Sequence, residues 1–266
     1  MSHVQSALLR QRLCGTWRCG VRGQQPYGTI PSCHHVAEVQ DRPNSAPGPS
    51  VMRLFLSSHR LGRHEDRLLQ LVGARRNALV VGNAQDHIPA AARALYQATA
   101  YDPVAELTRL GLPAGWLDLR DYIGAPIRLY DVLRTCGLVW VPGGNAFVLR
   151  RAMRASGFDA VIHGLLEQDA LVYGGSSAGA IVAAPTLRGL DLMDDPAPGT
   201  WGDEPVSYAG LGLFPRSVVP HVQSAHRDSP GADRAADWLT EQGLPFVGLQ
   251  DGQAILVDGD RTVLLP

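Results

Sequence analysis

The stretch Leu171–Ala184, LVYGGSSAGAIVAA, carries the strongest indication of the fold in this sequence. An apolar run stops at two glycines, turns through two serines and resumes with small residues, as a buried strand, a tight turn and a helix would. Gly175, Ser177 and Gly179 match G-x-S-x-G, the nucleophile elbow, in which a serine hydroxyl stands above the sheet. A plain strand-to-helix turn rich in small residues is the alternative explanation, so the rest of the chain must supply what a catalytic serine needs.

Short apolar runs alternate with helical patterns from Met52 to the end of the chain. Strands are expected at 52–56, 77–81, 116–119, 138–141, 170–173, 217–222 and 246–249, and helices at 65–71, 91–110, 127–133, 146–155, 159–167 and 232–242. Two runs, 254–257 and 261–265, flank an Asp-Gly-Asp turn and predict a closing β-hairpin. The chain is therefore predicted to be α/β, with a mostly parallel sheet, helices on both faces and a C-terminal β-hairpin.

The carboxyl ends of parallel strands share one edge of a sheet, where ligands bind. Ser58, Asn83, Ser177 and the Gly-Gly-Asn turn at 143–145 all follow predicted strands, so they are expected at that edge. The segment 188–210 is too long for a plain connection and is expected to be functional or mobile.

Residues 1–51 differ from the rest of the chain, because Gln, Arg, Ser, Gly and Pro follow no steady period. We interpret them as a disordered extension before a single domain at 52–266. Since Met52 opens the first strand, translation starting there is a further hypothesis. The extension holds possible zinc ligands, but the spacing without a second tight cysteine pair fits a zinc site poorly; they are Cys14, Cys19, Cys33, His34 and His35.

The composition narrows the class of protein. The 266 residues carry a net charge of −1 and all 24 basic residues are arginine, with no basic stripe that would indicate nucleic-acid binding. No run approaches the roughly 20 apolar residues of a membrane span, and the start lacks a secretory apolar core. Only Cys136 of the four cysteines lies in the predicted domain, which favours a reducing cytoplasm.

A catalytic serine needs a base, and His221 is the best candidate. It follows an apolar strand-like run in Val219-Pro220-His221, where a strand end would place an imidazole at the active edge. A hydrogen-bonded loop histidine is the structural alternative, and His226 is a weaker rival. His163 lies inside a predicted helix, and the remaining histidines of the domain are possible pocket residues without a stated role, namely His59, His64 and His87.

The base needs an orienting carboxylate, and Asp251 in Gly-Leu-Gln-Asp-Gly follows directly on a predicted strand. The alternative is an ordinary Asp-Gly turn, and three loop aspartates are rivals, namely Asp191, Asp194 and Asp195. The resulting order Ser, His, Asp differs from the Ser, Asp, His order of α/β-hydrolases, which points to a different fold. For the oxyanion, the N–H of Ala178 and the glycine turn at 143–144 are candidate donors.

Four segments together resemble one family. They are VPGGNAFVL at 141–149, YGGSSAGA at 173–180 with APTLR at 184–188, Pro220-His221, and GLQDG at 248–252. In this order and spacing they resemble the dipeptidase E (α-aspartyl dipeptidase) family, which includes the cyanophycinases, and the likeness runs from about 52 to 266. The resemblance implies a serine peptidase on a fold related to class I glutamine amidotransferases.

The resemblance also implies roles for particular residues. Ser177 matches the nucleophile, His221 the base and Asp251 the acidic member, while Gly144 and Ala178 match the oxyanion donors. Arg234 is the counterpart of an arginine that recognises the substrate aspartate, one residue out of register, and a guanidinium pairs bidentately with a carboxylate. Asn145 and Ser176 are predicted to contact substrate as well. No metal or organic cofactor is expected.

This sequence departs from the family pattern at three places, and these affect the expected identity of the substrate more than the expected reaction. Ser176 stands where dipeptidase E often has a bulky aromatic residue, Asp251 replaces glutamate, and the acidic loop 191–204 is longer. We therefore expect a cytoplasmic serine exopeptidase that cleaves small peptides, above all dipeptides with N-terminal aspartate, through an acyl-enzyme. The alternatives are a cyanophycinase-like or isoaspartyl peptidase with the same triad, and a non-catalytic binding protein for a small ligand. A homo-oligomer is possible, whereas nucleic-acid and membrane partners are not expected.

Overall fold

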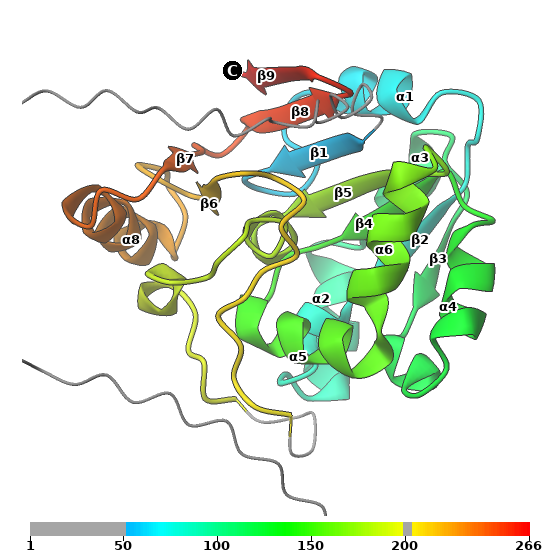
Figure 1. Ribbon diagram of the computed structural model, residues 1–266, viewed down its shortest axis with the longest axis horizontal. Coiled ribbons are helices and arrows are strands. Elements are labelled where there is room, and N and C mark those ends of the chain that lie inside the picture. Colours follow the sequence, from blue (N-terminus) through cyan, green and yellow to red (C-terminus); the bar gives the residue numbers. More distant parts are fainter. Residues whose placement is uncertain (1–51, 199–203) are drawn as a thin grey trace, which may run out of the picture. The chain divides into compact units, whose positions relative to one another are not determined.

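The centre of the molecule is a sheet of five parallel strands, each rich in apolar residues (Figure 1). The computed structural model describes residues 52–198 and 204–266, and all of them belong to one structural unit. The parallel strands, in spatial order, are β3 (Ala114–Leu117), β2 (Ala78–Val81), β4 (Leu138–Val141), β5 (Val172–Ser176) and β1 (Arg53–Ser57). The predicted α/β class with a mostly parallel sheet is confirmed.

Two antiparallel strands complete the sheet beside β1. They are β8 (Ala254–Asp258) and β9 (Arg261–Leu265), joined by a tight turn, and β8 pairs with β1 so that Phe55 lies opposite Leu256. The predicted C-terminal hairpin is therefore present and extends the sheet to seven strands.

The sheet is buried on both faces, because successive side chains of a strand point to opposite sides. On β4, Val139 and Val141 enter one hydrophobic core while Leu138 and Trp140 enter another. The first core lies under α4 (Pro126–Leu133), α5 (Ala146–Ser156), α6 (Phe158–Glu167) and the short α7 (Ala178–Ile181), and the second lies under α1 (Glu65–Val72) and α3 (Pro103–Arg109). Helices on both faces were predicted, and this is confirmed.

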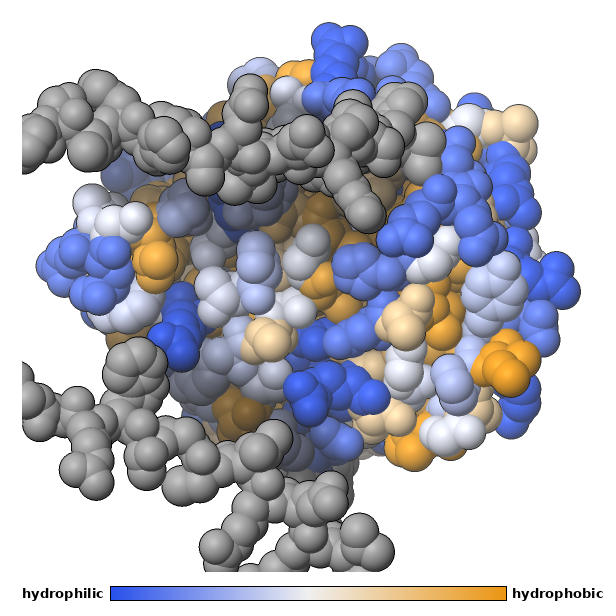
Figure 2. All heavy atoms as spheres, in the orientation of Figure 1, coloured by the Kyte–Doolittle hydropathy of each residue, from blue (hydrophilic) through white to orange (hydrophobic). Residues whose placement is uncertain are grey.

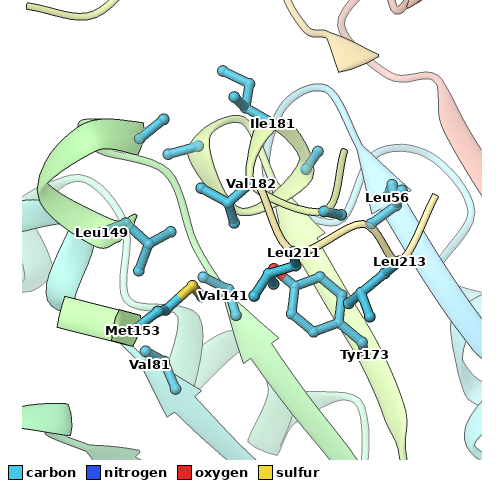
Figure 3. Close-up of a cluster of buried hydrophobic side chains, with 14 of the residues drawn as sticks. Leu56, Val81, Val141, Leu149, Met153, Tyr173, Ile181, Val182, Leu211 and Leu213 are labelled. Atoms are coloured by element: carbon cyan, nitrogen blue, oxygen red, sulfur yellow. The ribbon is translucent and has the colours of Figure 1, made fainter. Parts of the chain in front are cut away.

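Figure 3 shows how the larger core is filled. Side chains from the strands, such as Val81, Val141 and Tyr173, meet Met153 of α5 and Val182 just after α7. The packing fixes β5 and α7 against each other, so the turn between them has a rigid support on both sides.

The single helix expected at 91–110 is wrong, because two helices occupy this segment. They are α2 (Ala90–Thr99) and α3, and they are separated by a break at 100–102. Pro103 lacks the N–H that a continuing helix would use, and the Asp102 carboxylate accepts a hydrogen bond from the Val104 N–H to start the new helix. α2 buries none of its side chains, whereas α3 buries Leu107.

The strands expected at 217–222 and 246–249 are shorter and do not join the main sheet. They are β6 (Ser217–Val219) and β7 (Phe246–Gly248), which form a separate parallel pair, and α8 (Ser229–Glu241) connects them. β6 ends before Pro220, which has no N–H for a ladder. Three short 3₁₀ helices complete the described structure: η1 (Asn83–Gln85), η2 (Leu119–Tyr122) and η3 (Leu190–Leu192).

The face in Figure 2 is mainly hydrophilic, and its apolar side chains lie in small separate groups. Within the described residues, no helix has the length and apolar character that crossing a membrane requires. The proposed extension at 1–51, its possible zinc ligands and the alternative start at Met52 concern residues outside the described part, apart from Met52 itself.

Candidate active site

Ser177 lies in the turn between β5 and α7 with an unusual backbone conformation. Its φ of 49° and ψ of −112° are unfavourable for a residue with a side chain, and its N–H donates to the carbonyls of Ser57 and Ser58 at 3.2 and 3.1 Å. A Cβ on Gly175 would lie 2.5 Å from the Gly179 carbonyl oxygen, and one on Gly179 would clash with the Val141 carbonyl. The glycines of the elbow are therefore required by close packing.

The three side chains singled out in the sequence meet at the edge of the sheet. The Ser177 Oγ lies 3.0 Å from Nε2 of His221, and Nδ1 of the same ring lies 2.7 Å from Oδ1 of Asp251. His221 is 1% exposed, whereas Asp251 is partly exposed. The arrangement supplies a hydroxyl, a base for its proton and a carboxylate that orients the base.

Ser58 connects two of these groups and was not given a role from the sequence. Its Oγ donates to Asp251 Oδ1 at 2.8 Å and accepts a hydrogen bond from the His221 N–H at 2.8 Å. The second bond supports His221 in a left-handed backbone conformation, with φ at 65°. The only available signal was its position directly after a predicted strand, at the edge where ligands bind.

The electrostatic environment suits His221 as a neutral base. Burial lowers the pKa of His221, and His226 lowers it further, while the hydrogen bond with Asp251 acts in the opposite direction. Burial would raise the pKa of Asp251, but hydrogen bonds from His221 and Ser58 outweigh it, so the pKa is lowered. At neutral pH the pair is therefore an imidazole next to a carboxylate.

Two further histidines surround the base. The His226 ring stacks on His221 with centroids 3.8 Å apart and planes 8° from parallel, and His59 packs against His226 at 5.3 Å. One ring nitrogen from each of the three lies within 4.8 Å of the others, so they are the described residues that could hold a metal ion. The in-plane lone pairs of the stacked His221 and His226 rings, however, lie in nearly parallel planes, which is unfavourable for binding one metal ion.

Two backbone donors without a partner among the described residues belong to Gly144, which lines the same cavity as Ser177, and to Ala178, the residue after Ser177. Gly144 has a φ of 152°, and a Cβ there would lie 2.5 Å from the Ala84 carbonyl oxygen, so only glycine fits. The neighbouring Gly143 lies so close to Ser177 that a Cβ added to Gly143 would be 3.1 Å from Ser177 Cβ. Within the described residues, the N–H groups of Gly144 and Ala178 donate to no protein group, which leaves both available for an oxyanion.

A cavity of about 680 Å³ opens over the Ser177 hydroxyl. Its volume falls within the range of small-molecule sites. The side chains that line it come from the ends of β1 and β5, from the segment between η1 and α3, and from the loops after η3 and β6. They include His59, Arg60, His87, Arg93, Tyr101, Ser176, Asp194, Asp195, His226, Arg227 and Asp228. Ser176 thus lies where the sequence predicted a pocket residue.

The other two residues predicted to contact the substrate, Asn145 and Arg234, form hydrogen bonds within the protein. Asn145 caps α5, with its Oδ1 accepting from the N–H groups of Phe147 and Val148 at 2.9 Å and its Nδ2 donating to the Asp195 carbonyl. Its amide therefore lines the cavity but is used inside the protein. Arg234 is exposed on α8 and donates to the Leu192 carbonyl at 3.3 Å, and it is not among the side chains that line the cavity.

The loop aspartates that competed with Asp251 have other partners. Asp194 accepts a hydrogen bond from the Ala146 N–H at 2.8 Å, and burial raises its pKa to about 7. The Asp191 carboxylate accepts from the Gly189 N–H, and Asp195 accepts from the Ala197 N–H. None of these three carboxylates bonds to His221 within the described structure.

Comparison with known proteins gives a consistent result. Residues 81–265 match the model of peptidase family S51. Peptidase E of Streptomyces coelicolor is 32% identical over 188 residues, which are 66% of this chain and 72% of that protein. A Drosophila melanogaster protein named "probable alpha-aspartyl dipeptidase" is 32% identical over 144 residues, or 51% of this chain and 55% of that protein.

The fold has relatives among solved structures. A protein from Listeria monocytogenes EGD-e assigned to peptidase E superposes with a TM-score of 0.61 and 22% identity, over 80% of this chain and 97% of that chain. At this identity the likeness concerns the fold alone.

Proposed function

This chain belongs to peptidase family S51 and is a serine peptidase, and from that premise we propose that it hydrolyses small peptides, foremost dipeptides with N-terminal aspartate. The observation that carries the proposal is the continuous line from the Ser177 hydroxyl through His221 to Asp251, with separations of 3.0 and 2.7 Å. The name of the Drosophila relative supports the aspartyl substrate.

The first half of the reaction forms an acyl-enzyme. Ser177 Oγ attacks the scissile carbonyl carbon while its proton passes to His221 Nε2, and Asp251 stabilises the imidazolium. The negative charge that develops on the carbonyl oxygen is met by the N–H groups of Gly144 and Ala178. The C–N bond then breaks, and His221 returns the proton to the leaving amine.

The second half releases the acid. A water molecule gives its proton to His221 Nε2 and attacks the ester carbonyl, and the proton then returns to Ser177 as the C–O bond breaks. The residues thus regain their starting protonation, and the net reaction consumes one water and one peptide bond.

A panel of peptides tests the substrate. Purified protein is given Asp-Leu, β-Asp-Leu, β-Asp-Arg and Ala-Leu, and release of free amino acids is measured. Preference for Asp-Leu supports the proposal, whereas preference for the β-linked peptides favours a cyanophycinase-like or isoaspartyl peptidase. Absence of turnover on every peptide, with binding retained, would favour a non-catalytic binding protein.

A cytoplasmic location and a homo-oligomer also belong to the proposal. Cys136 is a buried free thiol, and burial raises its pKa to about 11, which is compatible with a reducing compartment. Cell fractionation and light scattering of the purified protein test the two points.

A further inference from the structure

Three arginines line the active-site cavity, and they differ in how their charge is compensated. Arg93 pairs with Asp86 at 3.1 Å and Arg227 pairs with Asp228 at 3.4 Å. Arg60 takes part in none of the ion pairs formed among the described residues. The one hydrogen bond of its side chain among the described residues runs from Nη2 to the Ala100 carbonyl at 3.3 Å. The Nε atom is buried, but Nη1 and the second N–H of Nη2 form no hydrogen bond within the described structure and are available to an acceptor in the cavity.

The position of Arg60 is fixed by the same loop that supports the base. Arg60 follows Ser58 by two residues, and its backbone has a φ of 50°, held by a hydrogen bond from Ser57 Oγ to the Arg60 carbonyl at 2.5 Å. The guanidinium carbon lies 4.5 Å from the centre of the Tyr101 ring, which also lines the cavity. Stacking on an aromatic face leaves the edge of the guanidinium free for a planar group such as a carboxylate.

In the part of the chain that the structure describes, half of the buried polar atoms without a partner belong to residues that line this cavity. Eight side-chain atoms of the described residues are buried and form no hydrogen bond. Four of these belong to cavity residues, namely Nε of Arg60, Nδ1 of His87, Nε of Arg93 and the hydroxyl oxygen of Tyr101. A buried polar group without a partner is costly, so the polar side chains of this cavity are not fully satisfied by the protein alone.

The other charges of the cavity leave a carboxylate few places to bind. The acidic side chains that line it are Asp194, Asp195 and Asp228, while Asp86 is already paired and lies beside Arg93. A ligand carboxylate is repelled by these groups and attracted by the uncompensated Arg60. Burial, with a contribution from Glu106, raises the pKa of Tyr101, so the phenol beside Arg60 stays neutral and does not cancel its charge.

We propose that Arg60, stacked on Tyr101, binds a carboxylate of the peptide substrate. The inference rests on the proposed peptidase function and deepens it. If that carboxylate is the aspartate side chain, Arg60 has the role expected from the sequence for Arg234, which is exposed and hydrogen-bonded to the Leu192 carbonyl. A peptide offers two such carboxylates, the aspartate side chain and the C-terminus, and the experiment distinguishes them.

The test compares kcat/KM for Asp-Leu, Asn-Leu and Asp-Leu amide in the wild type, Arg60→Gln and Arg234→Gln. Arg60→Gln is expected to lower the ratio of Asp-Leu to Asn-Leu, or of Asp-Leu to Asp-Leu amide, by about 10- to 100-fold, since a charged hydrogen-bonded pair is lost. The ratio that falls identifies the carboxylate. Arg234→Gln is expected to leave both ratios unchanged.

Two results would overturn the assignment. One is an equal loss of kcat/KM on all three peptides in Arg60→Gln, which leaves both ratios unchanged. The other is a change of either ratio in Arg234→Gln while Arg60→Gln changes neither. Should Arg60→Gln fold poorly, Arg60→Lys keeps the charge without the planar fork, and the same ratios are measured within that variant.

A binding measurement keeps this inference separate from the proposed reaction. Asp-Leu is titrated calorimetrically into Ser177→Ala and into the double variant that also carries Arg60→Gln. A loss of affinity of about 10-fold or more in the double variant supports the role of Arg60 even if no peptide is hydrolysed. Equal affinity in both proteins contradicts it, whether or not the wild type is a peptidase.

Discussion

At the residue scale, the candidate triad depends on a fourth side chain. Ser58 is fully buried and bonds to both His221 and Asp251, so it sets the position of the base relative to the carboxylate. Groups that hydrogen-bond to catalytic side chains and fix their position often contribute about one or two orders of magnitude to the rate, because a misplaced base transfers protons poorly. Ser58 acts through His221 and Asp251 rather than on the substrate.

We expect Ser58→Ala to lower kcat on Asp-Leu by about 10- to 100-fold while changing KM little. Ser156→Ala is a matched control, because Ser156 is equally buried but bonds only to carbonyls of its own helix, at Ala152 and Met153. A kcat for Ser58→Ala equal to that of Ser156→Ala would show that Ser58 has no positioning role. Thermal unfolding of both variants separates a loss of stability from a loss of rate.

The pH dependence follows from the environment of His221. The ring must be neutral to accept the Ser177 proton, and burial together with His226 lowers its pKa from the ordinary value of 6.5. kcat/KM is therefore expected to be constant around neutral pH and to fall on acidification, with a midpoint below 6.5. In His226→Phe an aromatic ring remains at this position but the coulombic effect of His226 on His221 is removed, so the midpoint should move up towards the ordinary value.

The control is His163→Gln, because His163 bonds to the Leu211 carbonyl away from the cavity. Its pH profile should match that of the wild type. A midpoint in His226→Phe at or below that of the wild type contradicts the expected effect of His226 on the base.

Part of the site could be predicted from sequence and part could not. Ser177, His221 and Asp251 each follow a strand-like run within a short motif, so local patterns were enough to select them. Ser58 and Arg60 carry no motif, and their importance arises from contacts with residues 163 positions away for Ser58 and 40 for Arg60. Arg234 was selected from a resemblance one residue out of register, and its helix directs it to the Leu192 carbonyl instead.

At the element scale, the elbow is held by packing between a strand and a helix. A Cβ on Gly179 would clash with the Val141 carbonyl of β4, and backbone cannot yield as a flexible side chain can. We expect Gly179→Ala to lower the free energy of unfolding by about 1–3 kcal/mol, the usual cost of overpacking a close contact.

Gly164→Ala is expected to have the opposite effect on the free energy of unfolding from Gly179→Ala. Gly164 lies inside α6, and no atom lies within 4 Å of the place that an alanine Cβ would take, so alanine should stabilise the protein by about 0.5–1 kcal/mol through helix propensity. Denaturant unfolding of both variants checks the pair. Similar stability of the two variants would contradict the packing of the elbow described here.

Helices and strands differed in how well the sequence predicted them. α5 and α6 lie within one residue of their expected limits, because Asn145 and Gly157 mark their ends clearly. The helix break at 100–102 was missed although Asp102-Pro103 is a start signal, since the apolar period continues across it. The pairing of β6 with β7 depends on the tertiary structure and cannot be predicted from the sequence of either strand alone.

At the scale of the whole molecule, the sheet brings distant segments to one edge. β1 and β5 are parallel neighbours, with Ser57 opposite Ser176, so the ends of both strands deliver Ser58 and Ser177 to the same place. β6 and β7 end nearby and contribute His221 and Asp251 through the loops that follow them. The α/β class could be predicted from the alternation of patterns, but the strand order depends on long-range pairing that the sequence does not display.

The central claim is that Ser177 is the nucleophile of a peptidase, and covalent labelling tests it most directly. The protein is treated with a serine-directed phosphonate, and the modified residue is located by peptide mass spectrometry in the wild type, Ser176→Ala and Ser177→Ala. We predict one label on Ser177 in the first two proteins, none in the third, and loss of Asp-Leu hydrolysis only in Ser177→Ala. A label on another residue, or undiminished hydrolysis by Ser177→Ala, would contradict the claim.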